Sequence, residues 1–172
     1  MSANEGIKVR AARSADVAAL LPMMAAFNRG EGIRFRRAPV AAALRRLLRE
    51  RRLGIVLVAE SPGRRGLDGY AVATFGYDLE FDGTDAFLTE LFVRPAHRRL
   101  GVGAQLLDAV AGALRKAGAR AVTLLVWPEN RAARRAYARA GFEELRRVAM
   151  VRRLAAGSRR RPALGHLRGS EE

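Results

Sequence analysis

The sequence predicts a single α/β domain, and three observations lead to this expectation. The chain has 172 residues, of which 49% are apolar and 28% charged, the balance of one compact core. Its hydrophobic spacing switches between the two-residue period of strands and the 3.6-residue period of helices. Cysteine is absent, so a disulfide scaffold is excluded, and a chain of this length buries enough surface to fold without one. We expect residues 1–154 to form the domain and residues 155–172 a basic, flexible tail.

The first half of the chain is expected to hold one strand, two helices and a three-stranded antiparallel meander. Ser14 or Asp16 can cap the first helix, in which apolar residues recur at helical spacing. Pro39 suits the first turn of the second helix. The expected elements are a strand at 7–10, a helix through 17–24, a linker at 28–37, a helix from 39 to about 52, and strands at 54–60, 69–77 and 86–93.

The second half is expected to alternate helices with strands. The apolar residues after Pro95 follow a helical period, and Gly118 is placed to end that helix. Asn130 can cap the next helix. The expected elements are a helix through 102–114, a buried strand at 121–127, a helix at 131–140 and a last strand or hairpin from 142 to about 154.

Charge is unevenly distributed along the chain. The 32 basic and 17 acidic residues give a net charge of +15, which favours an anionic partner, although a compositional bias that places arginine on solvated helix faces explains the same total. Much of the excess lies near the C-terminus, whereas residues 66–93 carry acidic side chains and no basic one. A nucleic-acid-binding module using Arg159–Arg161 is an alternative, but no known binding motif supports it, and no nucleic acid partner is expected.

Composition also excludes several classes of protein. Without cysteine and with only His97 and His166, no metal site is expected. No apolar run approaches the ~18 residues of a membrane helix. Residues 1–10 show no signal-peptide pattern, so we expect a cytoplasmic protein with no membrane partner.

A glycine-bearing turn between an expected strand and an expected helix is the most informative motif. A helix start presents unpaired N–H groups and the positive end of the helix dipole, which bind phosphate groups. Gly101 and Gly103 let the backbone come close to a bulky anion, and Arg98 and Arg99 add charged donors. The spacing fits neither a dinucleotide-binding turn nor a P-loop. We interpret this turn as a pyrophosphate cradle, with a generic glycine-rich turn as the alternative.

At this motif the chain resembles the GNAT superfamily of acyl-CoA-dependent N-acetyltransferases. The family signature, Arg/Gln-x-x-Gly-x-Gly/Ala after a central strand, is matched by Arg98–Gly103. A second family element, in which a strand, Asn, a helix, Tyr and Gly-Phe follow one another, is matched by 126–130, Tyr137 and 141–142. The resemblance covers about 7–154 and implies a mixed, mostly antiparallel sheet of about six to seven strands, about four flanking helices, and a V-shaped splay between the two central strands.

The resemblance implies that acetyl-CoA is the cosubstrate. The backbone amides of 100–104 would hold its pyrophosphate, and the exposed backbone of Leu91 and Val93 would pair with the pantetheine arm. Asn130 would contact the arm and the Tyr137 hydroxyl would face the thioester sulfur, while a plain helix cap and a half-buried packing residue remain the alternatives for these two. The residues so assigned to acetyl-CoA are Leu91, Phe92, Val93, Arg98, Arg99, Leu100, Gly101, Val102, Gly103, Ala104, Asn130 and Tyr137.

Glu90 and Tyr137 are the candidate catalytic residues. An alkylammonium has a pKa of ~10.4, so a proton must leave before its nitrogen can attack. Glu90 lies among Leu, Phe and Val in an expected strand, where a carboxylate is costly unless it faces a cleft or a partner. The resemblance implies that Glu90 accepts this proton, and a structural ion pair is the alternative. A backbone amide near Val93 would stabilise the oxyanion, and Tyr137 would protonate the leaving thiolate.

The acceptor is expected between two segments, since this superfamily places it between the linker at 28–37 and the loop at 77–85. Acidic side chains in that loop would attract a cationic amine, although ordinary solubilising acids explain them equally well. The candidate substrate-binding residues are Glu31, Phe35, Tyr77, Asp78, Glu80, Asp82 and Asp85.

The sequence therefore predicts an N-acetyltransferase that moves an acetyl group from acetyl-CoA directly to a primary amine, with no covalent enzyme intermediate. The expected partner is a small cationic amine, and a homodimer is compatible with the sequence. Acetylation of a protein N-terminus or lysine is one alternative. A catalytically silent acyl-CoA-binding sensor is another.

Overall fold

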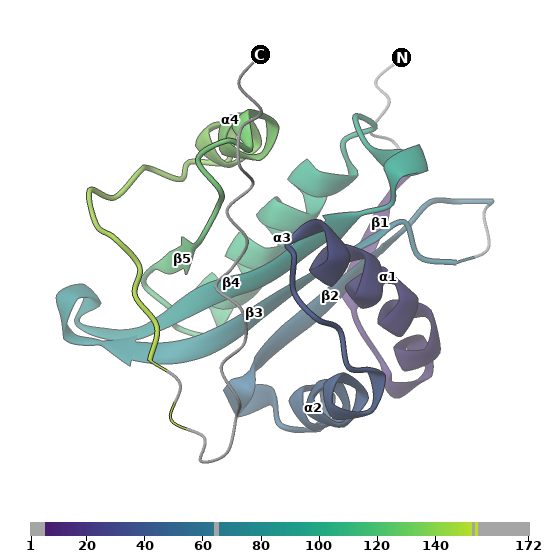
Figure 1. Cartoon of the computed structure of the whole chain (residues 1–172), viewed down its shortest axis with the longest axis horizontal. Coiled ribbons are helices and arrows are strands. Elements are labelled where there is room, and N and C mark those ends of the chain that lie inside the picture. The colour runs from purple at the N-terminus through teal and green to yellow at the C-terminus, as the bar shows by residue number, and fades with distance from the viewer. Residues whose placement is uncertain (1–5, 64–65, 153, 155–172) are drawn as a thin grey trace.

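The protein folds around one five-stranded sheet whose strand order follows the chain (Figure 1). The computed structural model describes residues 6–63, 66–152 and 154. Neighbouring strands are antiparallel from β1 to β4, and β5 is parallel to β4. The elements are β1 (Lys8–Ala11), α1 (Val17–Gly30), α2 (Arg37–Arg49), β2 (Gly54–Glu60), β3 (Gly69–Asp78), β4 (Gly83–Val93), α3 (Val102–Lys116), β5 (Val122–Leu124) and α4 (Arg131–Arg139). The expected mixed, mostly antiparallel α/β fold is confirmed, with fewer strands than predicted.

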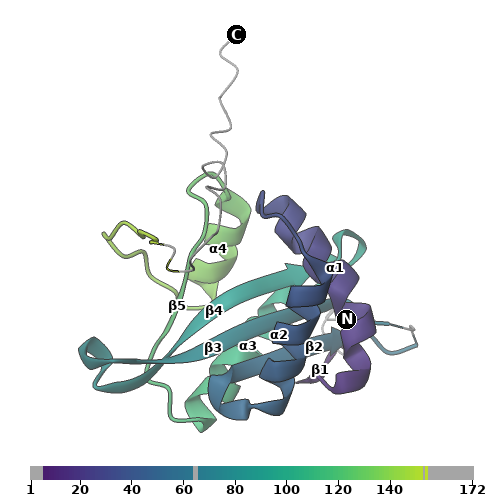
Figure 2. The ribbon, with the colours of Figure 1, turned by 60° about the horizontal axis from the view of Figure 1, so that its bottom comes forward.

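Helices cover both faces of the sheet. On one face, α1 and α2 pack against Val58, Tyr70 and other buried strand residues. On the opposite face, α3 packs Leu106 and Val110 against small strand residues such as Ala71. Figure 2 shows α1 and α2 on the near side of the sheet and α3 on the far side. Within the described ranges, no helix is long and apolar enough to cross a membrane.

The two strands of the β3–β4 hairpin are longer than the sequence predicted. A short 3-10 turn at Leu79–Phe81 follows β3. Asp82 then adopts a left-handed conformation with φ of 54°, and Gly83 follows with φ of 151°. This tight reversal lets β4 begin at Gly83 instead of residue 86, so the hairpin extends beyond the rest of the sheet (Figure 1).

The β4 and β5 strands separate after a short ladder. They pair from Ala86 and Val122 to Leu88 and Leu124, where β5 ends. β4 continues to Val93, still paired with β3 on its other side. Beyond Leu88, the edge of β4 that had paired with β5 has no described strand beside it. This separation is the predicted splay between the two central strands.

A β-bulge in β4 changes which face its side chains occupy. Val72 pairs with Glu90 and Ala73 pairs with Leu88, so Thr89 is the extra residue. Before the bulge, Leu88 faces α3. After it, Phe92 faces α1 and α2, although strict alternation from Leu88 would send it to the α3 side. Glu90 is two residues from Phe92 and shares its face.

The expected strand at 142–154 is wrong for the residues that the structure describes, because 142–152 and 154 contain no strand. Side-chain ion pairs fix this segment instead, between Arg134 and Glu144 and between Arg147 and Glu80. A strand needs a backbone partner, and the three residues of β5 offer little edge. Its large apolar side chains are consequently exposed, namely Leu145, Val148, Met150, Val151 and Leu154. The predicted tail at 155–172 lies outside the described residues.

Candidate active site

The turn at residues 98–101 and the first turn of α3 lie where the sequence predicted a pyrophosphate cradle. Arg99 and Gly101 adopt left-handed conformations, with φ of 62° and 84°. The first hydrogen bond of the helical pattern runs from the Gln105 amide to the Gly101 carbonyl at 3.1 Å. The amides of 102–104 precede this bond at the start of α3, so they are available to an anion.

Gly103 leaves room for a ligand at this helix start. A Cβ added there would meet nothing closer than a Val93 methyl carbon at 3.7 Å, an ordinary contact distance. Packing within the protein therefore does not require glycine at this position. Its absent side chain instead leaves the helix N-terminus open, which fits the approach of a pyrophosphate.

The arginines beside the cradle are solvent-exposed, as is Leu100. The sequence predicted a phosphate contact for Arg98. In the structure, Arg98 Nε donates to the Val93 carbonyl at 3.2 Å. Leu91 and Val93 turn their side chains toward α3, and Phe92 turns its ring toward α1 and α2. The open edge of β4 thus leads directly from Glu90 to the cradle.

Glu90 has a partner that sequence reasoning missed. The hydroxyl of Tyr70, a fully buried residue at the start of β3, donates to Glu90 Oε2 at 2.6 Å. Burial raises the pKa of Glu90 above its usual range, and the hydrogen bond from Tyr70 opposes that rise. The pKa of Tyr70 is also raised, by burial first and then by the Glu90 charge, so the phenol stays protonated. Tyr70 directly precedes the apolar run Ala71–Ala73, and because a buried tyrosine hydroxyl usually has a polar partner, this pattern is the sequence signal for such a contact.

Tyr137 and Asn130 lie on or beside α4. The Tyr137 ring packs edge-on against Phe142 with 5.7 Å between ring centres. Burial raises the pKa of Tyr137, and the negative charge of Glu31 raises it further. The two side chains therefore interact electrostatically. Asn130 Oδ1 accepts from the Ala133 amide at 3.1 Å, so the predicted helix cap is present.

A hydrogen bond connects the end of α1 to the segment after β5. Trp127 Nε1 donates to Glu31 Oε2 at 2.6 Å. Trp127 was not among the predicted site residues, although it follows a short apolar strand and precedes Asn130. Phe35, another predicted acceptor contact, instead packs against the core cluster under α1 and α2.

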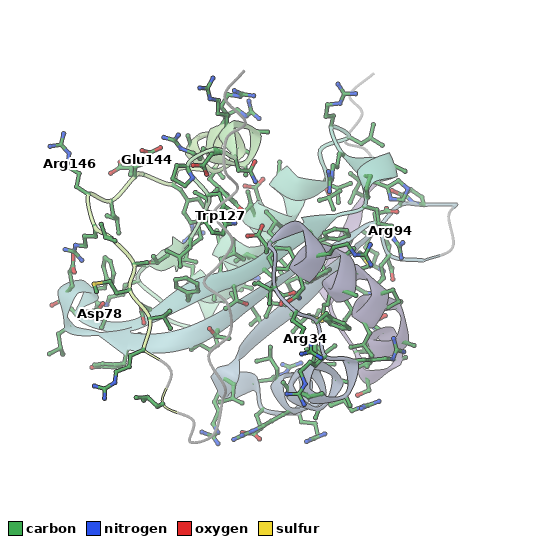
Figure 3. All side chains as sticks on the ribbon, viewed as in Figure 1. Arg34, Asp78, Arg94, Trp127, Glu144 and Arg146 are labelled. Atoms are coloured by element: carbon green, nitrogen blue, oxygen red, sulfur yellow. The ribbon has the colours of Figure 1, made fainter. Side chains whose placement is uncertain are left out.

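The structure does not bring the acidic hairpin residues to Glu90. Asp82 is eight residues from Glu90 along β4, about 25 Å at the usual strand rise. Figure 3 shows Asp78 at the end of the hairpin, well away from Trp127. Arg147 binds Glu80 through both carboxylate oxygens, at 2.7 and 2.9 Å. The predicted acidic cluster, made up of Asp78, Glu80, Asp82 and Asp85, is therefore partly neutralised by the chain itself. Tyr77, which lies beside the cluster, is exposed.

Comparisons with other proteins agree with this geometry. The sequence model of the acetyltransferase (GNAT) family matches residues 22–142. An integron cassette protein, HFX_CASS3, from the mobile metagenome of Cole Harbour Salt Marsh is 31% identical, with a TM-score of 0.75 over 86% of this chain and 90% of that one. A putative acetyltransferase from Arthrobacter sp. FB24 is 30% identical, with a TM-score of 0.72 over 86% of this chain and 96% of that one.

A solved CoA complex shares the fold at lower identity. The aminoglycoside N-acetyltransferase AAC(6')-Iy is 23% identical, with a TM-score of 0.73 over 87% of this chain and 95% of that one. No curated protein sequence matches at a significant level. The family model spans most of the described chain, including the cradle and the strands that separate beside it. The chain therefore belongs to the GNAT family of acetyltransferases.

Proposed function

We propose that this protein transfers an acetyl group from acetyl-CoA to a primary amine of a small cationic molecule. One observation carries the proposal: the open edge of β4 joins a half-buried carboxylate, Glu90, to an amide-lined helix start at Val102. The chain from Glu90 to Val102 would span about 40 Å if it were fully extended. The turns within this segment bring the two groups closer than that. A donor whose anionic end lies in the cradle can extend its acyl end along this edge toward Glu90.

The acceptor must lose a proton before it reacts. A primary ammonium has a pKa of ~10.4, so almost all of it is protonated at neutral pH and needs a base. Burial raises the pKa of Glu90, which makes its carboxylate a stronger base than an exposed one. In this proposal Glu90 takes the first proton directly or through a water molecule, and the amine nitrogen bonds to the thioester carbonyl carbon. The nitrogen then loses its second proton to solvent as the carbon–sulfur bond breaks and the thiolate leaves.

The leaving thiolate needs a donor, and Tyr137 is the group that we assign to it. The raised pKa of Tyr137 keeps its phenol protonated at neutral pH. A thiol has a pKa of ~8.5 and an unperturbed phenol ~10, so complete proton transfer between them is uphill by about 2 kcal/mol. The raised pKa of Tyr137 makes complete transfer still less favourable. We therefore assign Tyr137 a hydrogen bond to the developing thiolate, with the proton completed from solvent.

A small amine is the acceptor that the observations favour. The Glu31–Trp127 hydrogen bond links the end of α1 to the chain after β5, which restricts access for a folded protein segment. The similarity to AAC(6')-Iy, a named aminoglycoside N-acetyltransferase, supports the same substrate class. Acidic hairpin residues such as Asp82 are too far away to contact the reacting nitrogen, so we assign them only long-range attraction of cations.

Thiol release from acetyl-CoA tests the proposal. The chain contains no cysteine, so every thiol detected by a chromogenic reagent comes from CoA. We expect turnover with at least one member of a panel of polyamines, aminoglycosides, amino acids and peptides, and loss of turnover in Glu90→Gln. CoA binding without turnover on any amine would instead identify a silent acyl-CoA sensor, and turnover restricted to peptides would identify a protein acetyltransferase.

A further inference from the structure

A buried carboxylate lies outside the proposed catalytic groups. Asp68 is the one charged residue in the described part of the chain that is almost completely buried, with 2% of its surface exposed. It precedes β3 directly, at the end of the sheet where the cradle lies. Burying a carboxylate is costly unless hydrogen-bond donors satisfy it, so its surroundings identify what it holds.

Asp68 receives side chains from two separate segments. The Ser61 hydroxyl, just after β2, donates to Oδ2. Nδ1 of His97, just before the cradle turn, lies 2.8 Å from Oδ1, and only 15% of the His97 side chain is exposed. This separation is within ion-pair distance, although the imidazole ring is not oriented for a well-formed hydrogen bond. The carboxylate therefore ties the turn after β4 to the connection between β2 and β3.

The backbone reinforces the same junction. The Arg94 amide donates to the Asp68 carbonyl at 2.9 Å, and Arg94 Nε donates to the Leu67 carbonyl at 2.7 Å. Arg94 and the buried Val102 are thus the two ends of the segment that carries the cradle turn. His97 lies between them, so its side chain fixes the middle of a segment whose arginines and Leu100 are exposed.

The residue after Asp68 brings α3 into contact with the same junction. A Cβ at Gly69 would lie 2.7 Å from the Phe92 carbonyl oxygen and 3.3 Å from a methyl carbon of Val102. The first turn of α3 is thus packed directly on the strand that begins beside Asp68. Any displacement of Asp68 is transmitted to the amides that face the anion, because this packing leaves no free space.

We propose that His97 and Asp68 are positioning residues for the acyl donor: their contact holds the cradle turn in the conformation that binds the pyrophosphate. The inference rests on the proposed function only for the identity of the donor. It predicts an effect on donor affinity and no direct part in the chemical step, because neither side chain belongs to the Glu90 or Tyr137 contacts.

Two substitutions of His97 provide the test. His97→Leu keeps an apolar side chain of similar size but removes the donor, and His97→Asn keeps an N–H near the position of Nδ1. We expect His97→Leu to weaken CoA binding about tenfold in calorimetry and to raise the KM for acetyl-CoA equally. The kcat at saturating donor and the KM for the amine stay within threefold of wild type. His97→Asn restores CoA affinity to within threefold.

A stability control separates positioning from general loss of structure. Val56→Ala removes buried volume on the α1 and α2 face, away from the cradle, and lowers the melting temperature with CoA affinity unchanged. If His97→Leu is too unstable to purify, Ser61→Ala removes the other donor to the same carboxylate and is expected to weaken CoA binding two- to threefold.

The outcomes are distinguishable. A His97→Leu protein that binds CoA as tightly as wild type overturns the inference, as does one whose kcat falls while CoA affinity is unchanged. Equal loss of affinity in His97→Asn and His97→Leu also overturns it. If wild type binds CoA but acetylates no amine, the proposed function fails, and the calorimetric comparison still decides the role of His97. If wild type does not bind CoA, both fail.

Discussion

Replacing Tyr70 by phenylalanine isolates the hydrogen bond that Glu90 receives inside the sheet. The phenol donates to Glu90 Oε2 at 2.6 Å. Phenylalanine keeps the ring, whose centre lies 6.0 Å from that of Phe92. The substitution therefore removes one donor and leaves the packing in place.

The size of the effect follows from the charge on the acceptor. A hydrogen bond to a charged group contributes about 1.5–3 kcal/mol, and one pKa unit corresponds to about 1.36 kcal/mol. Tyr70 lowers the pKa of Glu90 while burial raises it, so loss of the donor raises the Glu90 pKa further. Because Glu90 must be ionised to accept a proton, we expect the acid limb of kcat/KM to move upward by about one pH unit.

Thiol release measured from pH 5 to pH 9 checks this expectation. The plateau at high pH should stay close to that of wild type, because a fully ionised Glu90 remains a base in Tyr70→Phe. In a Glu90→Gln background, the pH dependence of any residual thiol release should be the same with and without Tyr70→Phe. An acid limb at the wild-type position in Tyr70→Phe would refute the assignment of Glu90 as the group that must lose its proton.

Substitutions at three further positions test other parts of the site. Burial raises the pKa of Glu90 in the folded state, so its contribution to stability is present at low pH and lost as the pH rises through the folded value; Glu90→Gln should therefore raise the melting temperature at pH 8 more than at pH 4. Gly103→Glu should abolish CoA binding in calorimetry without unfolding the protein, whereas Gly103→Ala, with its nearest contact at 3.7 Å, should fold at least as stably as wild type. Tyr137→Phe should lower kcat about tenfold with unchanged CoA affinity, and an unchanged kcat under chemistry-limited conditions would reduce Tyr137 to a packing role.

Local patterns predicted most of the fold and the cradle. Helices and strands up to α4 follow from periodicity and caps, which depend on neighbouring residues, and Asn130 does cap α4. The cradle follows from a contiguous run, Arg98–Gly103, whose glycine at 101 takes the positive φ that the turn requires.

The features that sequence reasoning missed depend on residues far apart in the chain. Trp127 and Glu31 are 96 positions apart, and Arg147 and Glu80 are 67 apart. The C-terminal strand was predicted wrongly because β propensity at 142–154 says nothing about whether a partner edge exists. The Tyr70 contact was missed because the face that Glu90 occupies depends on the bulge, and no residue type identifies Thr89 as its extra residue.

The bulge at Thr89 also determines which changes of length β4 can accept without moving its carboxylate. Because of this extra residue, Leu88 and Glu90 occupy opposite faces of the sheet although they are two positions apart. A strand that kept every residue but paired without the bulge would send Glu90 toward the leucine-lined face of α3, while Leu91 and Val93 would turn the other way. Loss of Thr89 itself would instead make Leu88 and Glu90 neighbours in a regular ladder, with both side chains on the faces that they already occupy. The position of the carboxylate beside Tyr70 is therefore tied to the pairing of Glu90 with Val72, and a regular strand one residue shorter would preserve it.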